Sequence, residues 1–134
     1  MKAMEEVTAL TENYSIGNDE KAHPVLGRHV SLEKFHWFSG LLSRDQSEDL
    51  LIGFPNGAFL IRENKDRVLV LSVNYSNLIF HIKIKEQLGH FYLSEGQRFS
   101  SIEETISYYQ DHSLSESFPQ LPTVLTELMR NTYI

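Results

Sequence analysis

The feature that most restricts the fold of this chain is a short apolar run with a charged end. Ala58 to Ile61 are all apolar, Arg62 and Glu63 follow directly, and the turn sequence 55–57 (Pro-Asn-Gly) comes before them. Such a run between a turn and charged residues is typical of a central strand that is covered on both faces. Because side chains alternate along a strand, we expect Arg62 to share a face with Ala58 and Leu60, at the base of a pocket.

The segments on either side predict two helices and further strands. Ser43 and Gln46 have the spacing of a capping box, which predicts a helix over 44–52. Apolar residues at helical spacing predict a second helix over 101–111. The ranges expected to form strands are 58–63, 68–74, 78–85, 91–93 and 123–125, with residues 75–77 as a hairpin turn. This order predicts an α+β fold, with a central antiparallel β-sheet flanked by two α-helices.

The N-terminal segment differs in composition from the rest. Residues 1–33 are mostly polar and charged, with breakers at Gly17 and Pro24. We expect a poorly ordered tail or linker, with a short helix over 8–14 as the alternative. The length of 134 residues favours a single domain, which we place at 34–134.

Composition and charge exclude several classes of function. The chain has no cysteine, so disulfides, thiolate metal sites and a cysteine nucleophile are excluded. The net charge of −6 argues against binding to nucleic acid or to an anionic membrane. No apolar run is long enough for a membrane span, and the first residues lack the apolar stretch of a signal peptide. We therefore expect a cytoplasmic protein.

The positive charge is concentrated in one part of the chain. Residues 44–85 hold six Lys or Arg against five Asp or Glu, a balance of +1, so the rest of the chain carries −7. A small basic site on an acidic protein suits a discrete anion rather than a long polyanion.

The sequence gives no sign of an enzyme. It contains no P-loop, no G-x-S-x-G motif and no kinase motif. His23, His29 and His36 lie in or near the N-terminal segment without the spacing of metal ligands. We expect no catalysis, no metal and no cofactor.

A series of motifs identifies the chain with a known family. Residues 57–63 (GAFLIRE) resemble the G-x-F-L-V-R-E signature of SH2 (Src-homology 2) domains, and residues 37–40 (WFSG) resemble the W-[YF]-x-G motif that precedes it. Further matches follow in family order at 43–48, 71–73, 80–84, 89–93, 99–104 and 108–114, so the resemblance covers roughly residues 35–126. Within the family, residues 108–118 are most similar to the Vav guanine nucleotide exchange factors, with the phosphoinositide 3-kinase regulatory subunit as a second relative.

The resemblance implies a phosphotyrosine-peptide binding module with Arg62 as the main phosphate anchor. A phosphotyrosine carries nearly two negative charges, and the planar guanidinium of an arginine can bind two of its oxygens at once. A recessed arginine also favours the long phosphotyrosine over the short phosphoserine. The further phosphate-site residues that the resemblance implies are Arg44, Asn64, Lys65, His81 and Lys83.

These residues have expected roles. Arg44 contacts the phosphate and the ring, His81 organises the pocket, and Lys83 flanks the ring. Residues 63–67 form the phosphate-binding loop, in which Asn64 replaces the usual Ser or Thr, and which is about two residues shorter than in Vav or Src.

A second pocket is implied for the residues that follow the phosphotyrosine. Its expected members are Ile82, Leu93, Ser94, Glu95, Gly96 and Leu114. Ile82 is aliphatic where Src-like members carry Tyr, which resembles the class that prefers apolar residues in the peptide. The alternative is that Ile82 and Leu93 are simply core residues.

Other interpretations stay open at this level. Arg62 can be a strand-end arginine paired with Glu63, and Arg44 a solvated helix charge among Asp45, Glu48 and Asp49. The whole chain can be a degenerate SH2 scaffold for phosphate-independent protein interaction. Our expected partners are tyrosine-phosphorylated proteins or peptides, bound by a monomer that binds no nucleic acid.

Overall fold

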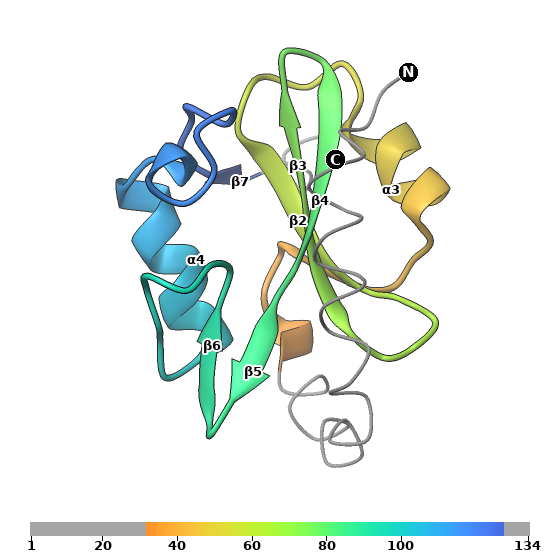
Figure 1. The fold of residues 1–134 in the computed structure, drawn as a ribbon. Coiled ribbons are helices and arrows are strands. Elements are labelled where there is room, and N and C mark those ends of the chain that lie inside the picture. The colour runs from red at the N-terminus through yellow and green to blue at the C-terminus, as the bar shows by residue number, and fades with distance from the viewer. Residues whose placement is uncertain (1–31, 128–134) are drawn as a thin grey trace.

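The computed structural model describes residues 32–127, and Figure 1 shows their arrangement. The expectations for residues 1–31, including the short helix over 8–14, lie outside the described residues. In chain order the elements are η2 (Leu32–Lys34), β1 (Phe38–Leu41), α3 (Arg44–Leu51), β2 (Ala58–Glu63), β3 (Leu69–Tyr75), β4 (Leu78–Lys83), β5 (Lys85–Gln87), β6 (His90–Tyr92), α4 (Ile102–Asp111), η3 (Leu114–Glu116) and β7 (Thr126–Glu127).

The predicted central sheet is present and is mostly antiparallel. Its strand order is β1-β2-β3-β4, with β7 also paired to β2. The long strands β2, β3 and β4 pair antiparallel, as expected. The short strands β1 and β7 pair parallel with β2, which the sequence did not predict. A second sheet consists of β5 and β6.

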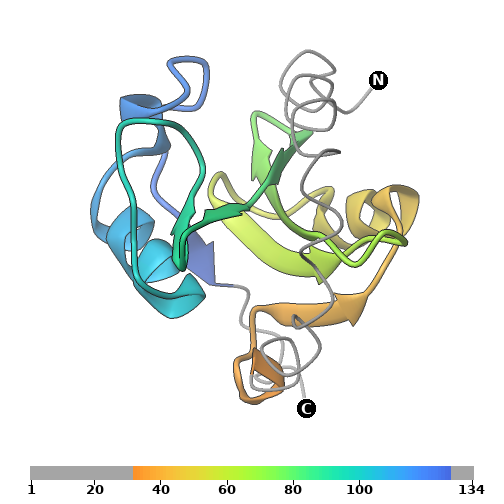
Figure 2. The ribbon, with the colours of Figure 1, turned by 60° about the horizontal axis from the view of Figure 1, so that its bottom comes forward.

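The two faces of the central sheet bury different apolar clusters, and Figure 2 shows α3 and α4 on opposite sides of the sheet. On the α3 side, Leu51 packs with Ala58, Leu60 and Ile79. The larger cluster on the α4 side contains the intervening residues of β2, Phe59 and Ile61, and residues of α4 such as Ile106. The expected alternation along β2 is therefore confirmed, and it assigns Arg62 to the α3 face.

Both predicted helices are present and begin at serine caps. The capping box before α3 is confirmed, because Gln46 N donates to Ser43 Oγ at 3.0 Å and Ser43 N donates to Gln46 Oε1 at 2.9 Å. Helix α3 ends at Leu51, one residue before the predicted end, because Ile52 has an extended backbone. Ser101 caps α4 in the same way by accepting from Glu104 N.

The hairpin between β3 and β4 has the predicted position. Ser76 and Asn77 both have positive φ, 55° and 63°, which defines a two-residue turn whose twist matches the flanking strands. The predicted strand over 78–85 is wrong at its end, because β4 stops at Lys83 and β5 begins at Lys85 in the other sheet. The intervening Ile84 N donates to Leu69 O.

The C-terminal strand also differs from the prediction of 123–125. The strand that forms is Thr126–Glu127, which pairs with Ala58 and Phe59. Leu125 N instead donates to Tyr109 O on α4. This segment crosses the start of β2 so closely that a Cβ on Gly57, which has φ +92°, would clash with the backbone oxygen of Val124. A glycine is required there by both the φ and the contact.

Within residues 32–127, no helix has the length and apolar character needed to cross a membrane. The same residues contain no group of three His, Cys, Asp or Glu side chains arranged to hold a metal ion.

Candidate functional site

The expected phosphate-site residues of the strands lie on the α3 face of the sheet. The strand register places Arg62 and Lys83 in one row across the sheet, on either side of Val70. His81 lies in the neighbouring row, with Ser72 and Leu60. Arg62 is 3% exposed and Lys83 is buried beside the same valine. The sheet therefore brings together three residues that lie up to 21 positions apart in the sequence.

The guanidinium of Arg62 is held by three groups. Its Nε donates to Ser72 Oγ at 3.1 Å, its Nη1 donates to the backbone oxygen of Leu42 at 3.2 Å, and its Nη2 lies 3.3 Å from His81 Nδ1. The next residue, Glu63, lies on the opposite face of β2 and accepts a hydrogen bond from Arg67 Nε. The alternative in which Arg62 is a strand-end charge paired with Glu63 does not describe this geometry.

His81 connects the strand residues to α3. Its ring is 1% exposed, with Nδ1 at 2.9 Å from Ser72 Oγ and Nε2 at 2.9 Å from Glu48 Oε2. Burial, helped by the charges of Arg62 and Arg44, lowers the pKa of His81 to about 3. The ring is therefore neutral near pH 7, and the contact with Glu48 is a hydrogen bond rather than an ion pair of two full charges.

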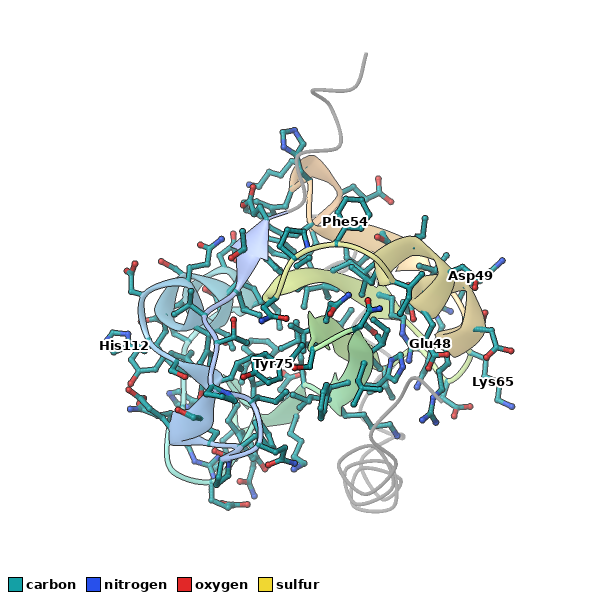
Figure 3. The ribbon with its side chains drawn as sticks, turned by 90° about the horizontal axis from the view of Figure 1, so that it is seen from above. Glu48, Asp49, Phe54, Lys65, Tyr75 and His112 are labelled. Carbon is teal, nitrogen blue, oxygen red and sulfur yellow. The ribbon has the colours of Figure 1, made fainter. Side chains whose placement is uncertain are left out.

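Helix α3 contributes one residue that was expected and one that was not. Arg44 is the first residue of the helix, is partly exposed, and has its Nε at 3.7 Å from Glu48 Oε2. Glu48 appeared only as part of a family motif and as one of the acidic neighbours of Arg44, but it is buried. Figure 3 shows Glu48 on the side of α3 that faces the sheet and Asp49 on its outer side. The available signal was the spacing of four residues from Arg44, which places both side chains on one helix face.

Ser72 is the second site residue that sequence reasoning missed. It appeared only as part of a family motif, yet its side chain is completely buried between Arg62 and His81. Its position directly opposite His81 in the register was not readable before the pairing of β3 and β4 was known.

The expected phosphate-binding loop is a tight turn stabilised from within. Asn64 Oδ1 accepts from Asp66 N at 2.8 Å and from Val68 N at 3.0 Å, and Arg67 N donates to Asn64 O at 2.9 Å. Three consecutive amides of the turn are thus bonded inside it. The exposed Lys65 is the cationic side chain at the tip of this turn.

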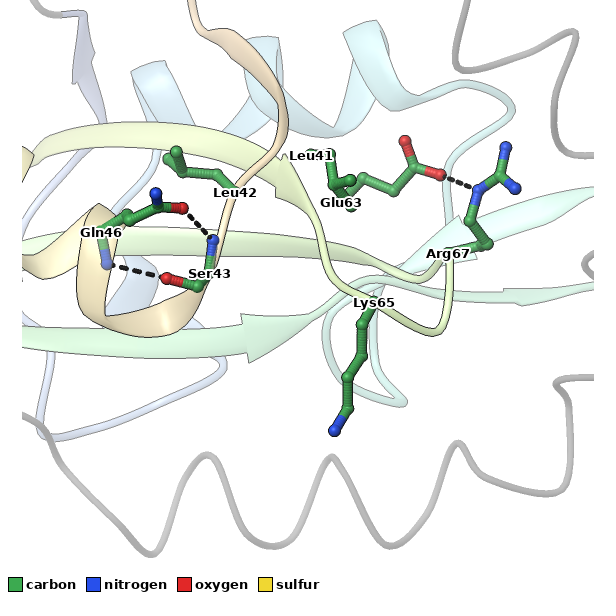
Figure 4. A pocket seen from close by; sticks show the side chains of 7 residues that line it. All are labelled: Leu41, Leu42, Ser43, Gln46, Glu63, Lys65 and Arg67. Carbon is green, nitrogen blue, oxygen red and sulfur yellow. Dashed lines mark hydrogen bonds and ion pairs between the residues drawn. The ribbon is translucent and has the colours of Figure 1, made fainter.

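An open hollow of about 670 Å³ lies between this loop and the start of α3 (Figure 4). Its lining residues are Leu41, Leu42, Ser43, Gln46, Glu63, Lys65 and Arg67. The polar side chains at its two ends bond one another, in the capping box and in the pair of Glu63 with Arg67. Arg62 is not a lining residue but is bonded to Leu42, so the hollow borders the Arg62 cluster without being part of it.

The expected specificity residues divide into a buried and an exposed group. Ile82, Leu93 and Leu114 are at most 1% exposed and belong to the large apolar cluster on the α4 side. Residues 94–96 lie at the surface, where Glu95 pairs with Arg98, and Arg98 covers the ring of Tyr92 at 4.1 Å. Ile82 and Leu93 are therefore core residues, as the alternative interpretation expected.

Tyr108 joins two loops beside this cluster. Its hydroxyl accepts from Gln97 Nε2 at 3.0 Å and donates to Glu116 Oε1 at 2.6 Å, while its ring stacks on His112. The hydrogen bond to Glu116 raises the pKa of Tyr108 to about 12. The sequence marked Tyr108 only as part of a family motif.

Comparisons with known proteins agree on one family. The family model described as "SH2 domain" matches residues 37–109. Guanine nucleotide exchange factor VAV3 from human is 34% identical over 107 residues, which are 78% of this chain and 13% of that protein. Protein vav-1 from Caenorhabditis elegans is 35% identical over 99 residues, which are 72% of this chain and 10% of that protein. The chain therefore spans only a small part of the length of these relatives.

Solved structures give the same result. The solution structure of the SH2 domain of human proto-oncogene protein VAV1 has a TM-score of 0.66 and 28% identity, covering 72% of this chain and 71% of that one. The VAV1 SH2 domain complexed with a tyrosine-phosphorylated peptide from SLP76 has a TM-score of 0.65 and 29% identity, covering 71% and 70%.

Proposed function

The chain belongs to the SH2 domain family, and from this premise we propose that it binds phosphotyrosine peptides through Arg62, with Arg44, His81 and Lys83 completing the site. The observation that carries the proposal is the buried guanidinium of Arg62, held by Ser72 and His81 on the α3 face. The solved complex of a similar SH2 domain with a tyrosine-phosphorylated peptide supports the class of ligand.

The charges of the site match the proposed ligand. Arg44, Arg62 and Lys83 supply three positive charges, Glu48 supplies one negative charge, and His81 is neutral, which leaves +2. A phosphotyrosine carries between about −1.5 and −2 near neutral pH. Binding therefore neutralises the site, and the exposed Lys65 adds further attraction at its edge.

The site is also organised before the ligand arrives. The bonds of Arg62 to Ser72, His81 and Leu42 fix the guanidinium in the free protein. Because those torsions are already restricted, little side-chain entropy is lost on binding. Its depth favours a phosphate on a long aromatic side chain over a phosphate on serine.

We propose that the peptide lies across β4, which is an edge strand of the central sheet. Successive residues of β4 point to opposite faces, so His81 and Lys83 lie on the α3 face and Ile82 on the α4 face. The residues after the phosphotyrosine are then recognised near the surface residues 94–96, which follow the buried Leu93 in the chain. An apolar peptide residue is expected there because Ile82 is aliphatic where Src-like members carry Tyr.

The expected partners are tyrosine-phosphorylated proteins, bound by a cytoplasmic monomer that does not bind nucleic acid. The net charge of −6 supports the last point. The nucleotide-exchange activity in the name of VAV3 belongs to a protein of which this chain spans 13%, and we propose no catalysis for this chain.

Calorimetric titration tests the proposal. A phosphotyrosine peptide pool and its unphosphorylated counterpart are titrated into wild type, Arg62→Ala and Arg62→Lys. We expect Arg62→Ala to lose about 2–5 kcal/mol of binding free energy for the phosphorylated pool. Arg62→Lys should lose most of the same amount, because an ammonium lacks the paired donors of the guanidinium. Arg67→Ala is the matched control, since Arg67 is exposed and paired with Glu63, and it should lose no more than about 1 kcal/mol.

The alternative function is a scaffold that binds proteins independently of phosphate. The observation in its favour is the loop at Asn64, whose amides are bonded inside the turn. Equal affinity for both peptide pools, unaffected by Arg62→Ala in a folded protein, would establish this alternative. Salt provides a second criterion, because capture of a phosphate weakens as ionic strength rises, whereas apolar docking does not.

A further inference from the structure

Glu48 is a carboxylate buried in a site that is otherwise arranged to bind an anion. It is 7% exposed, and its Oε2 lies 2.9 Å from His81 Nε2. A negative charge so close to Arg44 and Arg62 opposes the binding of phosphate by simple electrostatics. Beside its ion pair with Arg44, the carboxylate has a second role, which involves His81.

The hydrogen-bond directions define this role. A neutral imidazole has one nitrogen that donates and one that accepts. An ionised carboxylate only accepts, so the nitrogen that faces Glu48, Nε2, carries the hydrogen. Nδ1 of His81 is then an acceptor, directed at Ser72 Oγ and Arg62 Nη2.

Ser72 is the next residue in this series of hydrogen bonds. With Nδ1 as acceptor, Ser72 donates its hydroxyl hydrogen to His81 Nδ1 at 2.9 Å, and its oxygen accepts from Arg62 Nε at 3.1 Å. The Ser72 oxygen can accept from Arg62 in either tautomer, but the contact of Arg62 Nη2 with His81 Nδ1 requires the tautomer that Glu48 selects. With the hydrogen on Nδ1, the ring would present a donor to the Nη2 of Arg62, which is also a donor.

We propose that Glu48 is a positioning residue of the phosphate pocket, whose carboxylate fixes the tautomer of His81 and thereby gives Arg62 Nη2 the acceptor that holds its orientation. This inference rests on the function proposed above and assigns to that site a residue that does not contact the ligand. The lowered pKa of His81 agrees with it, because a ring that stays neutral keeps Nδ1 as an acceptor across the physiological range.

Two variants separate this role from charge and from packing. Glu48→Gln and Glu48→Leu remove the same negative charge, but only glutamine keeps an oxygen that accepts from His81 Nε2. The ring tautomer of His81 is read in the free protein from its ¹⁵N chemical shifts, assigned with His81→Gln. Affinity for N-acetyl-phosphotyrosine amide, a probe that reaches only the phosphate pocket, is measured by NMR titration. Asp49→Asn is the control for loss of an exposed charge from the same helix.

We expect hydrogen on Nε2 in wild type, Glu48→Gln and Asp49→Asn, and a shift toward Nδ1 in Glu48→Leu. Glu48→Gln should bind the probe at least as tightly as wild type, because it removes a repulsive charge. Glu48→Leu should bind about tenfold more weakly than Glu48→Gln, which is the effect of one misdirected hydrogen bond. Equal affinity of the two variants, or hydrogen on Nδ1 in wild type, overturns the proposal.

The design also separates this inference from the proposed function. If the wild type does not bind the probe, phosphate recognition fails as a function for all variants alike. The tautomer measurement does not need the probe and still shows whether Glu48 controls His81. If Glu48→Leu does not fold, the wild-type tautomer and the affinity of Glu48→Gln decide, since a loss of binding in Glu48→Gln contradicts the role of the acceptor.

Discussion

The hydroxyl of Tyr108 donates to the carboxylate of Glu116 at 2.6 Å and thereby ties α4 to η3. The same oxygen accepts from Gln97, which lies in the segment between β6 and α4. One side chain of α4 thus connects two loops that flank the apolar cluster containing Leu93 and Leu114. These loops have the positions that we propose for recognition of the peptide beyond its phosphotyrosine.

Tyr108→Phe removes this connection while leaving the ring in place. We expect a change in which residues are preferred after the phosphotyrosine, because the two loops are no longer held at a fixed distance. The affinity for phosphotyrosine itself should stay within about twofold, since Tyr108 is remote from Arg62. Selection from a phosphopeptide library measures both quantities. Gln97→Ala removes one of the two bonds and should give a smaller change, and identical preferences in all three proteins would contradict the assignment of the loops.

Stability should depend on pH through His81. The unfolded chain protonates this ring near pH 6.5, whereas the folded protein does so only near pH 3, because of burial and the charges of Arg62 and Arg44. The stabilisation is therefore complete above pH 6.5 and is lost as the pH falls from 6.5 toward 3. The contribution to the slope is at most about 1.4 kcal/mol per pH unit.

Urea denaturation between pH 4 and pH 7 measures this dependence. His81→Gln, which does not titrate, should flatten the curve relative to wild type. His90→Gln, at an exposed position, is the control for the His→Gln substitution itself. Parallel curves for wild type and His81→Gln would show that His81 binds its proton equally in the folded and unfolded states, so that folding does not lower the pKa of the ring.

Gly57→Ala should be strongly destabilising. It places a Cβ against the backbone oxygen of Val124 at a residue with φ +92°. Gly40→Ala is a matched control, because Gly40 has φ +70° with open space around it. We expect a loss of about 1 kcal/mol at Gly40 from backbone strain alone and about 3 kcal/mol or more at Gly57. Chemical denaturation checks the difference, and equal losses would mean that the crossing segment moves away at little cost.

Substitutions at the neighbouring residues Asn64 and Lys65 should affect different properties, stability at Asn64 and phosphopeptide binding at Lys65. Asn64→Ala removes two hydrogen bonds that close the loop, and we expect a loss of about 1–2 kcal/mol in the free energy of unfolding.

Lys65→Ala removes an exposed charge and should change stability by less than about 0.5 kcal/mol. It should instead weaken phosphopeptide binding at low salt and have little effect at high salt. If Lys65→Ala has no effect at any salt concentration, the loop does not reach the phosphate.

The sequence predicted the parts of the fold that local patterns determine. The capping box at Ser43 and the apolar run from Ala58 define their elements within a few residues of chain, and both are confirmed. Strand β1 was missed because its residues are only partly buried and show no alternation. Strand β7 was misplaced because two residues carry no pattern of their own, and their position is set by pairing with Ala58 and Phe59.

In the candidate site, too, the sequence predicted what local motifs determine and missed what depends on packing. Family motifs identified Arg62 and His81, and the structure places both on one face. Glu48 was not identified, because an acidic residue in the sequence Asp-Gln-Ser-Glu-Asp looks like its solvated neighbours. Its burial depends on how α3 lies against the sheet, where Leu51 packs with strand residues that include the distant Ile79. The hydrogen bonds that close the loop at Asn64 were also not predicted, because they depend on the backbone geometry of the loop.

The alternation along β4 has a consequence for how such a domain changes over evolution. In the proposed binding mode, the peptide is recognised at its phosphotyrosine by side chains on the α3 face and at the following residues by side chains on the α4 face. The two requirements therefore depend on different residues, on opposite faces of the sheet. Substitutions on the α4 side can then alter the choice of partner while the requirement for modification is inherited intact. A lineage can redirect its signalling in this way without passing through a form that has lost the switch.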